Sequence, residues 1–317
     1  MIKKNIVLVF GAGASFPYGF PLGKTLKSMI EKQILSPSDD KHLDLNELLL
    51  GFDFTMDELH KFAKELRSSM QPSVDAFLFE RKEYLDIGKL AIAANLITCE
   101  NEENLTTGDS DEETGRWYGY LLNNFLGTRN EFINSNLNIV TFNYDHSLEY
   151  FLFLTLQSRF QLTEEETTSY IERYLPIVHV YGQLGKPHFI ETSAYCREYI
   201  DTIDLEILWE SAQSIDLIYD DKRANTESFE LAHNLISKSD MVIFVGFGYH
   251  EKNLERLMLN KYYRTTEIYG TFYGMRPGEV LRAKNAVHRQ SALSHRDRVV
   301  SYSDDALNFL KNENILV

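Results

Sequence analysis

The sequence predicts an α/β fold, in which a parallel sheet carries helices on both faces and a helical subdomain is inserted into it. Short apolar runs rich in branched and aromatic residues alternate with amphipathic stretches of helical period over most of the 317 residues. Between residues 36 and 132 the strand signals stop and only helical patterns remain. We therefore interpret residues 36–132 as a helical insertion within a single domain of residues 1–317.

The first expected strand is followed by a glycine-rich loop. Residues 6–10, IVLVF, form the kind of short apolar run that is typical of a buried parallel strand, and GAGAS follows at residues 11–15. Gly11 and Gly13 permit a tight turn, and a helix is expected at residues 23–35. This order predicts bare backbone amides that suit a diphosphate. Because GAGAS is not a complete G-x-G-x-x-G pattern, a tight turn without a ligand stays open as the alternative.

The remaining elements follow from the same periodicities. Helices are expected within the insertion at residues 47–50, 56–70, 74–97 and 116–126, and the acidic residues 99–114 predict a mobile loop. Further strands are expected at residues 137–142, 177–181, 215–219, 241–245, 268–273 and 299–302. The helices of this part are expected at residues 147–160, 164–174, 228–238, 253–259, 279–288 and 304–312. Ligands of such sheets bind at the carboxyl ends of the strands, so the loops after the strands form the candidate site.

Composition excludes several classes of protein. The formal net charge of −15 argues against direct nucleic-acid binding, although backbone amides could still bind a small phosphorylated ligand. No apolar run is long enough to span a membrane and no signal-peptide cleavage site is present, so we expect a cytoplasmic protein. Cys99 and Cys196 cannot form a four-thiolate zinc site. No histidine shows metal-ligand spacing and no HExxH motif occurs, so no metal site is expected.

An amide and a carboxylate follow the second expected strand, in TFNYD at residues 141–145. Asn143 can donate and accept, which suits a water molecule or a ribose hydroxyl, and Asp145 can accept from a carboxamide or hydroxyl. Asp145 could equally cap the helix that begins near Ser147. The two roles of Asp145 are compatible.

Two later motifs add candidates. In HVYG, residues 179–182, alternation places His179 and Tyr181 on one face of the strand. His179 could act as a base near neutral pH or serve as a structural histidine in the core. In VGFG, residues 245–248, Gly246 and Gly248 repeat the glycine pattern and indicate close approach of the backbone to a ligand or to the first loop.

Taken in order, GAGAS with Gly19-Phe20-Pro21, TFNYD, HVYG and VGFG resemble the motifs of the sirtuin-like domain family, and more closely its bacterial branch associated with antiphage defence. The resemblance covers nearly the whole chain and implies a Rossmann-like core that binds NAD and hydrolyses it to ADP-ribose and nicotinamide. The residues implied in NAD binding are Gly11, Ala12, Gly13, Ala14, Ser15, Pro21, Gly182, Gly246 and Gly248. Those implied in catalysis are Asn143, Asp145, His179 and Tyr181.

The chain departs from the family pattern at two points. Protein-deacylating sirtuins hold a zinc ribbon with two cysteine pairs, which this chain cannot build, so neither zinc nor deacylation is expected. The catalytic histidine of the family stands directly before the glycine that Gly182 matches, where this chain has Tyr181. A second interpretation is therefore a module that binds NAD or ADP-ribose without cleaving it and signals to a partner. The trigger would come from a homo-oligomer, a signal nucleotide or a defence-system partner.

Overall fold

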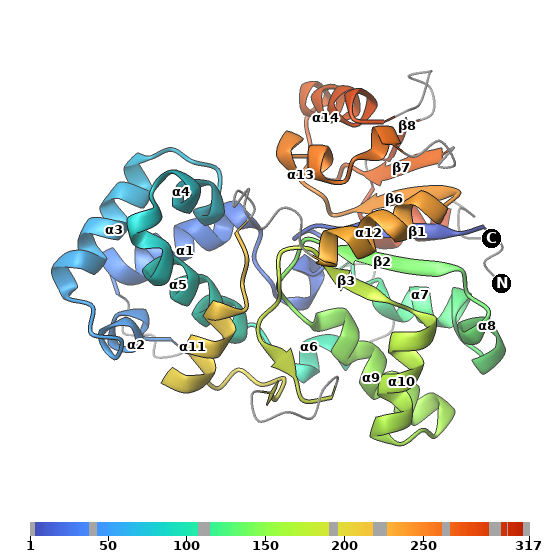
Figure 1. Ribbon diagram of the computed structural model, residues 1–317, viewed down its shortest axis with the longest axis horizontal. Helices are drawn as coiled ribbons and strands as arrows, with labels where there is room; N and C mark the ends of the chain where they lie inside the picture. Colours follow the sequence, from blue (N-terminus) through green and yellow to red (C-terminus); the bar gives the residue numbers. More distant parts are fainter. Residues whose placement is uncertain are drawn as a thin grey trace.

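A computed structural model describes residues 4–37, 43–106, 115–189, 196–217, 227–261, 267–291, 299–302 and 304–312. It consists of a parallel sheet flanked by helices and a separate lobe of helices (Figure 1). Among the residues described, no helix is both long and apolar enough to cross a bilayer.

Six parallel strands form the main sheet, in the order β3-β2-β1-β6-β7-β8. Their bounds are β1 Ile6–Phe10, β2 Leu137–Thr141, β3 Ile177–His179, β6 Met241–Val245, β7 Glu267–Thr271 and β8 Val299–Tyr302. Every residue of β1 is buried, and Ile6 pairs with Leu137 on one side and Met241 on the other. Numbered along the chain, this order is the 3-2-1-4-5-6 of a doubly wound Rossmann-like sheet, whose order reverses between β1 and β6. The predicted fold class is confirmed.

Helices of the middle and the C-terminal part of the chain surround the sheet (Figure 1). They are α6 Glu102–Thr106, α7 Tyr118–Phe125, α8 Arg129–Ile133, α9 Ser147–Phe160, α10 Glu164–Tyr174, α12 Glu227–Lys238, α13 Glu251–Arg256, α14 Pro277–Arg289 and α15 Ala306–Asn312. A second sheet pairs two short strands, β4 Lys186–Pro187 and β5 Cys196–Arg197. Three 3-10 helices complete the elements, η1 Phe16–Tyr18, η2 Lys82–Tyr84 and η3 Leu259–Lys261.

The helical lobe lies beyond the carboxyl ends of the strands, at the left of Figure 1. Its helices are α1 Gly23–Leu35, α2 Leu45–Leu50, α3 Met56–Ser68, α4 Val74–Glu80, α5 Leu85–Ile97 and α11 Leu205–Gln213. Helix α1, expected after the first loop, packs against α3 and α5, because its apolar face of Leu26, Ile30 and Ile34 is buried in the lobe. Helix α11 joins α5 from far along the chain. The lobe is therefore assembled from segments on both sides of the second and third strands.

Three expected elements differ in the structure. The strand expected at residues 215–219 is reduced to an isolated bridge between Ile215 and Gly182, and its last two residues lie outside the described ones. The single helix expected at residues 74–97 is two helices, because Arg81 has a non-helical backbone between them. Part of the acidic stretch expected to be a loop forms α6, and residues 107–114 lie outside the described ones.

Candidate functional site

The loops that follow β1 and β6 pack directly against each other at the point where the strand order reverses. Gly246 adopts a φ of +58°, and a Cβ atom added there would lie 2.2 Å from the backbone nitrogen of Ala14. A Cβ added at Gly13 would lie 2.7 Å from the Cα of Gly246. Only glycines permit this close approach of two backbones. The expectation that Gly246 approaches the first loop is confirmed.

The amides of the first loop are largely used within the protein. Gly11 N donates to the Val245 carbonyl at 3.1 Å, and Gly13 N donates to the Gly246 carbonyl at 2.9 Å. Ala14 N donates to the Gly11 carbonyl at 2.8 Å. The expectation that the two glycines leave bare amides is therefore wrong, because the last residue of β6 and the loop after it supply their acceptors. The short η1 also stands between this loop and α1, so the dipole of α1 does not begin at the loop.

Asn143 and Ser15 are held together at the ends of β2 and β1. Asn143 Nδ2 donates to the Gly11 carbonyl at 3.1 Å and to Ser15 Oγ at 3.2 Å. Ser15 Oγ in turn donates to Asp145 Oδ2 at 2.8 Å. None of the residues that the structure describes donates to Asn143 Oδ1. The half-buried Asn143 thus has a fixed amide nitrogen and an oxygen left to accept from a ligand.

Asp145 organises the loop from a buried position. Its Oδ1 accepts from Ser147 N at 3.1 Å and from Ser147 Oγ at 2.5 Å. Burial raises the pKa of Asp145, and the two serine hydroxyls oppose this rise. Asp145 accepts from Ser147 N, the first amide of α9, but the N-cap residue is His146, so Asp145 does not occupy the capping position expected for it. Both carboxylate oxygens already accept hydrogen bonds within the protein.

His179 is enclosed and both of its ring nitrogens are engaged. Nδ1 donates to the Asn143 carbonyl at 2.9 Å, and Nε2 lies 2.5 Å from Glu149 Oε1. Burial lowers the pKa of His179 and the neighbouring Glu149 raises it. The effect of Glu149 outweighs that of burial, so the pKa lies above its ordinary value. Burial would raise the pKa of Glu149, but its histidine neighbours hold that pKa below its ordinary value. His179 therefore positions the backbone of Asn143 rather than offering a free base.

Sequence reasoning missed that Glu149 and His146 join His179. His146 Nδ1 lies 3.9 Å from Glu149 Oε1, and burial lowers the pKa of His146. The side chains of His146, Glu149 and His179 are 1%, 6% and 7% exposed. The sequence carried a signal for this cluster: His146 and Glu149 directly follow TFNYD and are three residues apart. Residues at this spacing share a helix face, so their side chains could be expected to meet.

Tyr181 has different neighbours from His179. Its hydroxyl donates to Asn253 Oδ1 at 3.0 Å and accepts from Arg256 Nη1 at 3.0 Å, both from α13. Its ring packs edge-on against Phe142. The expected alternation of His179 and Tyr181 on one strand face is wrong, because β3 ends at His179.

The other residues implied in NAD binding lie at varied depths. Gly182 has a φ of +74°, and a Cβ there would lie 2.1 Å from the Ser214 carbonyl oxygen, so it packs against backbone. Gly248 is exposed, and Pro21 is half-buried between η1 and α1. Ala12 is half-buried within the first loop.

A tyrosine of the loop after β2 contacts the helical lobe. Tyr144 Oη donates to Asp75 Oδ1 at 2.7 Å and to the Asp216 carbonyl at 3.1 Å. Asp75 lies in the first turn of α4. Burial raises the pKa of Asp75, and the hydrogen bond from Tyr144 opposes that rise. The lobe is thereby anchored one residue away from Asn143.

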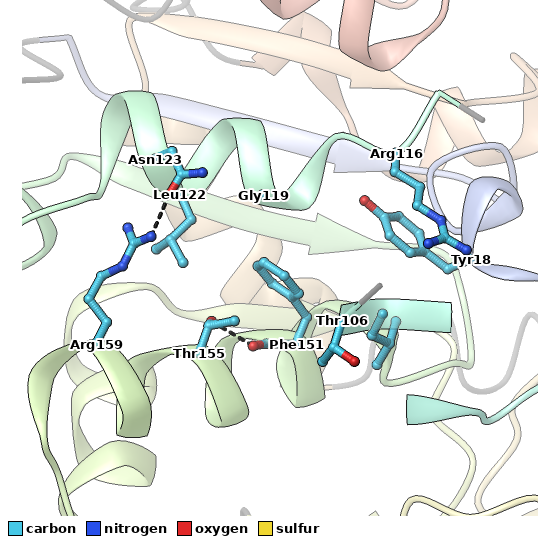
Figure 2. Close-up of a pocket in the computed structure, with 10 residues that line it drawn as sticks. Tyr18, Thr106, Arg116, Gly119, Leu122, Asn123, Phe151, Thr155 and Arg159 are labelled. Carbon is cyan, nitrogen blue, oxygen red and sulfur yellow. Dashed lines mark hydrogen bonds between the residues drawn. The ribbon is translucent and has the colours of Figure 1, made fainter. Parts of the chain in front are cut away.

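A cavity of about 130 Å³ lies elsewhere, between α7 and α9. Figure 2 shows Tyr18 near one end of it and Arg159 near the other. Arg159 is hydrogen-bonded to Asn123 there. Among the described residues, the lining of this cavity includes none of those predicted for the site.

Comparison with known proteins assigns no family to the chain: no protein-family model matches it, and no curated protein matches it.

Proposed function

We propose that this protein binds NAD at the carboxyl ends of the central strands and hydrolyses it to ADP-ribose and nicotinamide. The observation that carries the proposal is the anchored Asn143, whose Nδ2 is bound by the first loop while its Oδ1 accepts from no described residue. It stands beside the reversal of strand order, where open α/β sheets bind their ligands. The four sirtuin-like motifs support NAD as the ligand and bacterial antiphage defence as the context.

The chemistry needs an oriented water more than a strong base. Water oxygen bonds to the ribose carbon while the bond to nicotinamide breaks, nicotinamide leaves with the bonding pair as a neutral molecule, and the water releases one proton. Positive charge develops on the ribose, so an acceptor oxygen that positions water close to it lowers the barrier. Asn143 Oδ1 would supply that acceptor, and the His179 contact would hold its backbone in place.

A second candidate function has an observation of its own. The hydroxyl of Tyr181, at the position of the family histidine, is bound by Asn253 and Arg256, and both nitrogens of His179 are engaged. These contacts favour a module that binds NAD or ADP-ribose and signals to a partner or a second copy of the chain. The two functions share the loop after β1 and differ in whether nicotinamide is released.

Nicotinamide release from NAD by the purified protein tests both candidates. We expect Asn143→Ala to lower the rate by roughly 100-fold, as removal of one positioned polar group does in other enzymes. Asn124→Ala, at an exposed position on α7, is the matched control and should keep the wild-type rate. Full release by Asn143→Ala would overturn the site, and NAD binding without release in every assembly state would favour the module. Absence of NAD binding in calorimetry would overturn both.

A further inference from the structure

Two histidines and one glutamate converge behind the loop of Asn143, outside the groups that would contact NAD. His146 precedes α9, Glu149 lies in its first turn, and His179 ends β3. Their ligand atoms, His146 Nδ1, a Glu149 carboxylate oxygen and His179 Nε2, lie within 4.8 Å of one another. All three side chains are more than nine-tenths buried.

Each ring is held from its outer side by a backbone carbonyl. His146 Nε2 lies 3.0 Å from the Gly185 carbonyl, and His179 Nδ1 lies 2.9 Å from the Asn143 carbonyl. Because a carbonyl only accepts, these two nitrogens carry protons, and in a neutral ring the inner nitrogen then presents a lone pair. Metal-binding histidines are oriented in this way by their outer hydrogen bonds.

The inner side of the cluster therefore brings acceptors together. Two lone pairs and a carboxylate meet in a buried space. A second proton, on His179 Nε2, would turn its contact with Glu149 into a hydrogen bond but would leave His146 Nδ1 without a donor. His146 Nδ1 remains buried without a hydrogen bond from the part of the chain that the structure describes. A cation between the three groups would satisfy them together. We propose that His146, Glu149 and His179 bind a divalent transition-metal ion such as Zn²⁺.

The geometry fits an ion after a small shift. Ligand atoms at about 2.0–2.1 Å from a tetrahedral ion lie roughly 3.3 Å apart. Glu149 Oε1 is 2.5 Å from His179 Nε2 and 3.9 Å from His146 Nδ1, which bracket that separation. The nitrogens of the two rings that face each other lie within 4.8 Å, so the rings as well as the carboxylate would each move by about 1 Å or less, and a water would complete the four ligands.

The consequence of the ion would be structural. His179 Nδ1 holds the Asn143 carbonyl, so fixing the ring fixes the loop that carries Asn143. The site differs from the sirtuin zinc ribbon in its ligands and position, and it does not depend on the proposed NAD chemistry. Metal binding of this kind adds to the free energy of unfolding.

The test uses untagged wild-type protein, stripped with a chelator and then titrated with Zn²⁺ or Co²⁺. We expect about one ion per chain, a higher melting temperature with Zn²⁺ than after stripping, and the visible absorption of tetrahedral Co²⁺. His146→Gln and Glu149→Gln should lose the ion. His188→Gln should keep it, because the half-buried His188 lies outside the cluster and pairs with Glu198 at 2.9 Å.

The Co²⁺ spectrum of wild-type protein decides the question even if a variant folds poorly. Absence of both the Co²⁺ absorption and a Zn²⁺-dependent shift in melting temperature would overturn the proposal. Full binding by a folded His146→Gln would overturn it as well.

Discussion

The hydroxyl of Tyr144 and the carboxylate of Asp75 form a 2.7 Å hydrogen bond that joins the loop after β2 to the first turn of α4. Asn143 directly precedes Tyr144, so one residue links the helical lobe to the anchored amide. Insertions that follow strand ends commonly overhang the ligand site of such sheets. This contact couples the position of the lobe to that of Asn143.

Replacing Tyr144 with Phe removes that hydroxyl and leaves Asp75 without its donor. We expect the free energy of unfolding in urea to fall by about 1–2 kcal/mol, because the carboxylate loses a hydrogen bond that compensates its desolvation. NAD affinity in calorimetry should fall too. Tyr120→Phe on α7, where the ring packs against Phe125, is the control. Wild-type values for Tyr144→Phe would mean that the contact does not hold the lobe.

Gly246 tests the contact between the two glycine loops. An added methyl group would meet the backbone of Gly13 and Ala14 at 2.2 Å, at a φ of +58°. Gly274 has a φ of +74°, and no described atom lies within 4 Å of its added Cβ, so Gly274→Ala isolates the cost of the backbone conformation. We expect Gly274→Ala to cost about 1 kcal/mol in denaturant unfolding and Gly246→Ala at least about 3 kcal/mol. Equal costs would show that the first loop moves aside without penalty.

Local patterns predicted the elements that carry the site. The bounds of α1, α9, α10, β6 and β8 agree with the expected ranges. The break at Arg81 was not predictable, since the apolar period continues across it. The place of α1 in the lobe depends on partners from α3 and α5, which no local pattern identifies.

The part of the candidate site that lies directly after the strands could be predicted from the sequence. Ser15 and Asn143 follow adjacent parallel strands, so their meeting could be expected from the fold class. The internal acceptors for the amides of Gly11 and Gly13 come from the end of β6 and the loop after it, and the partner of His179 comes from α9. These pairings depend on exact side-chain and backbone placement, which the sequence pattern does not specify.

Ser15→Ala tests the hydrogen bonds that hold Asn143. The change removes a donor to buried Asp145 and an acceptor for Asn143. We expect a loss of about 1–3 kcal/mol in the free energy of unfolding, and slower nicotinamide release because the Asn143 side chain keeps only its bond to the Gly11 carbonyl. Ser68→Ala, at an exposed position on α3, should change neither quantity. Unchanged stability and release in Ser15→Ala would contradict the anchoring role.

A buried ion pair predicts how stability depends on pH. Glu100 Oε1 accepts from Arg197 Nη2, while Glu100 Oε2 is buried and has no partner among the described residues. Burial raises the pKa of Glu100 from 4.5 to about 7, and Arg197 opposes this rise only in part. The folded state therefore binds the proton more tightly than the unfolded state does.

The sign of the pH effect follows from that difference. The stabilisation from the protonated Glu100 is fully present below the unfolded pKa and is lost as the pH rises through the folded pKa. Relative to Glu100→Gln, which cannot titrate, the wild-type protein should lose on the order of 2 kcal/mol of unfolding free energy between about pH 5 and about pH 8. Urea unfolding across this range measures the difference, with exposed Glu165→Gln on α10 as the control. A difference between wild type and Glu100→Gln that stays constant with pH would show that Glu100 remains ionised in the folded protein, held by Arg197.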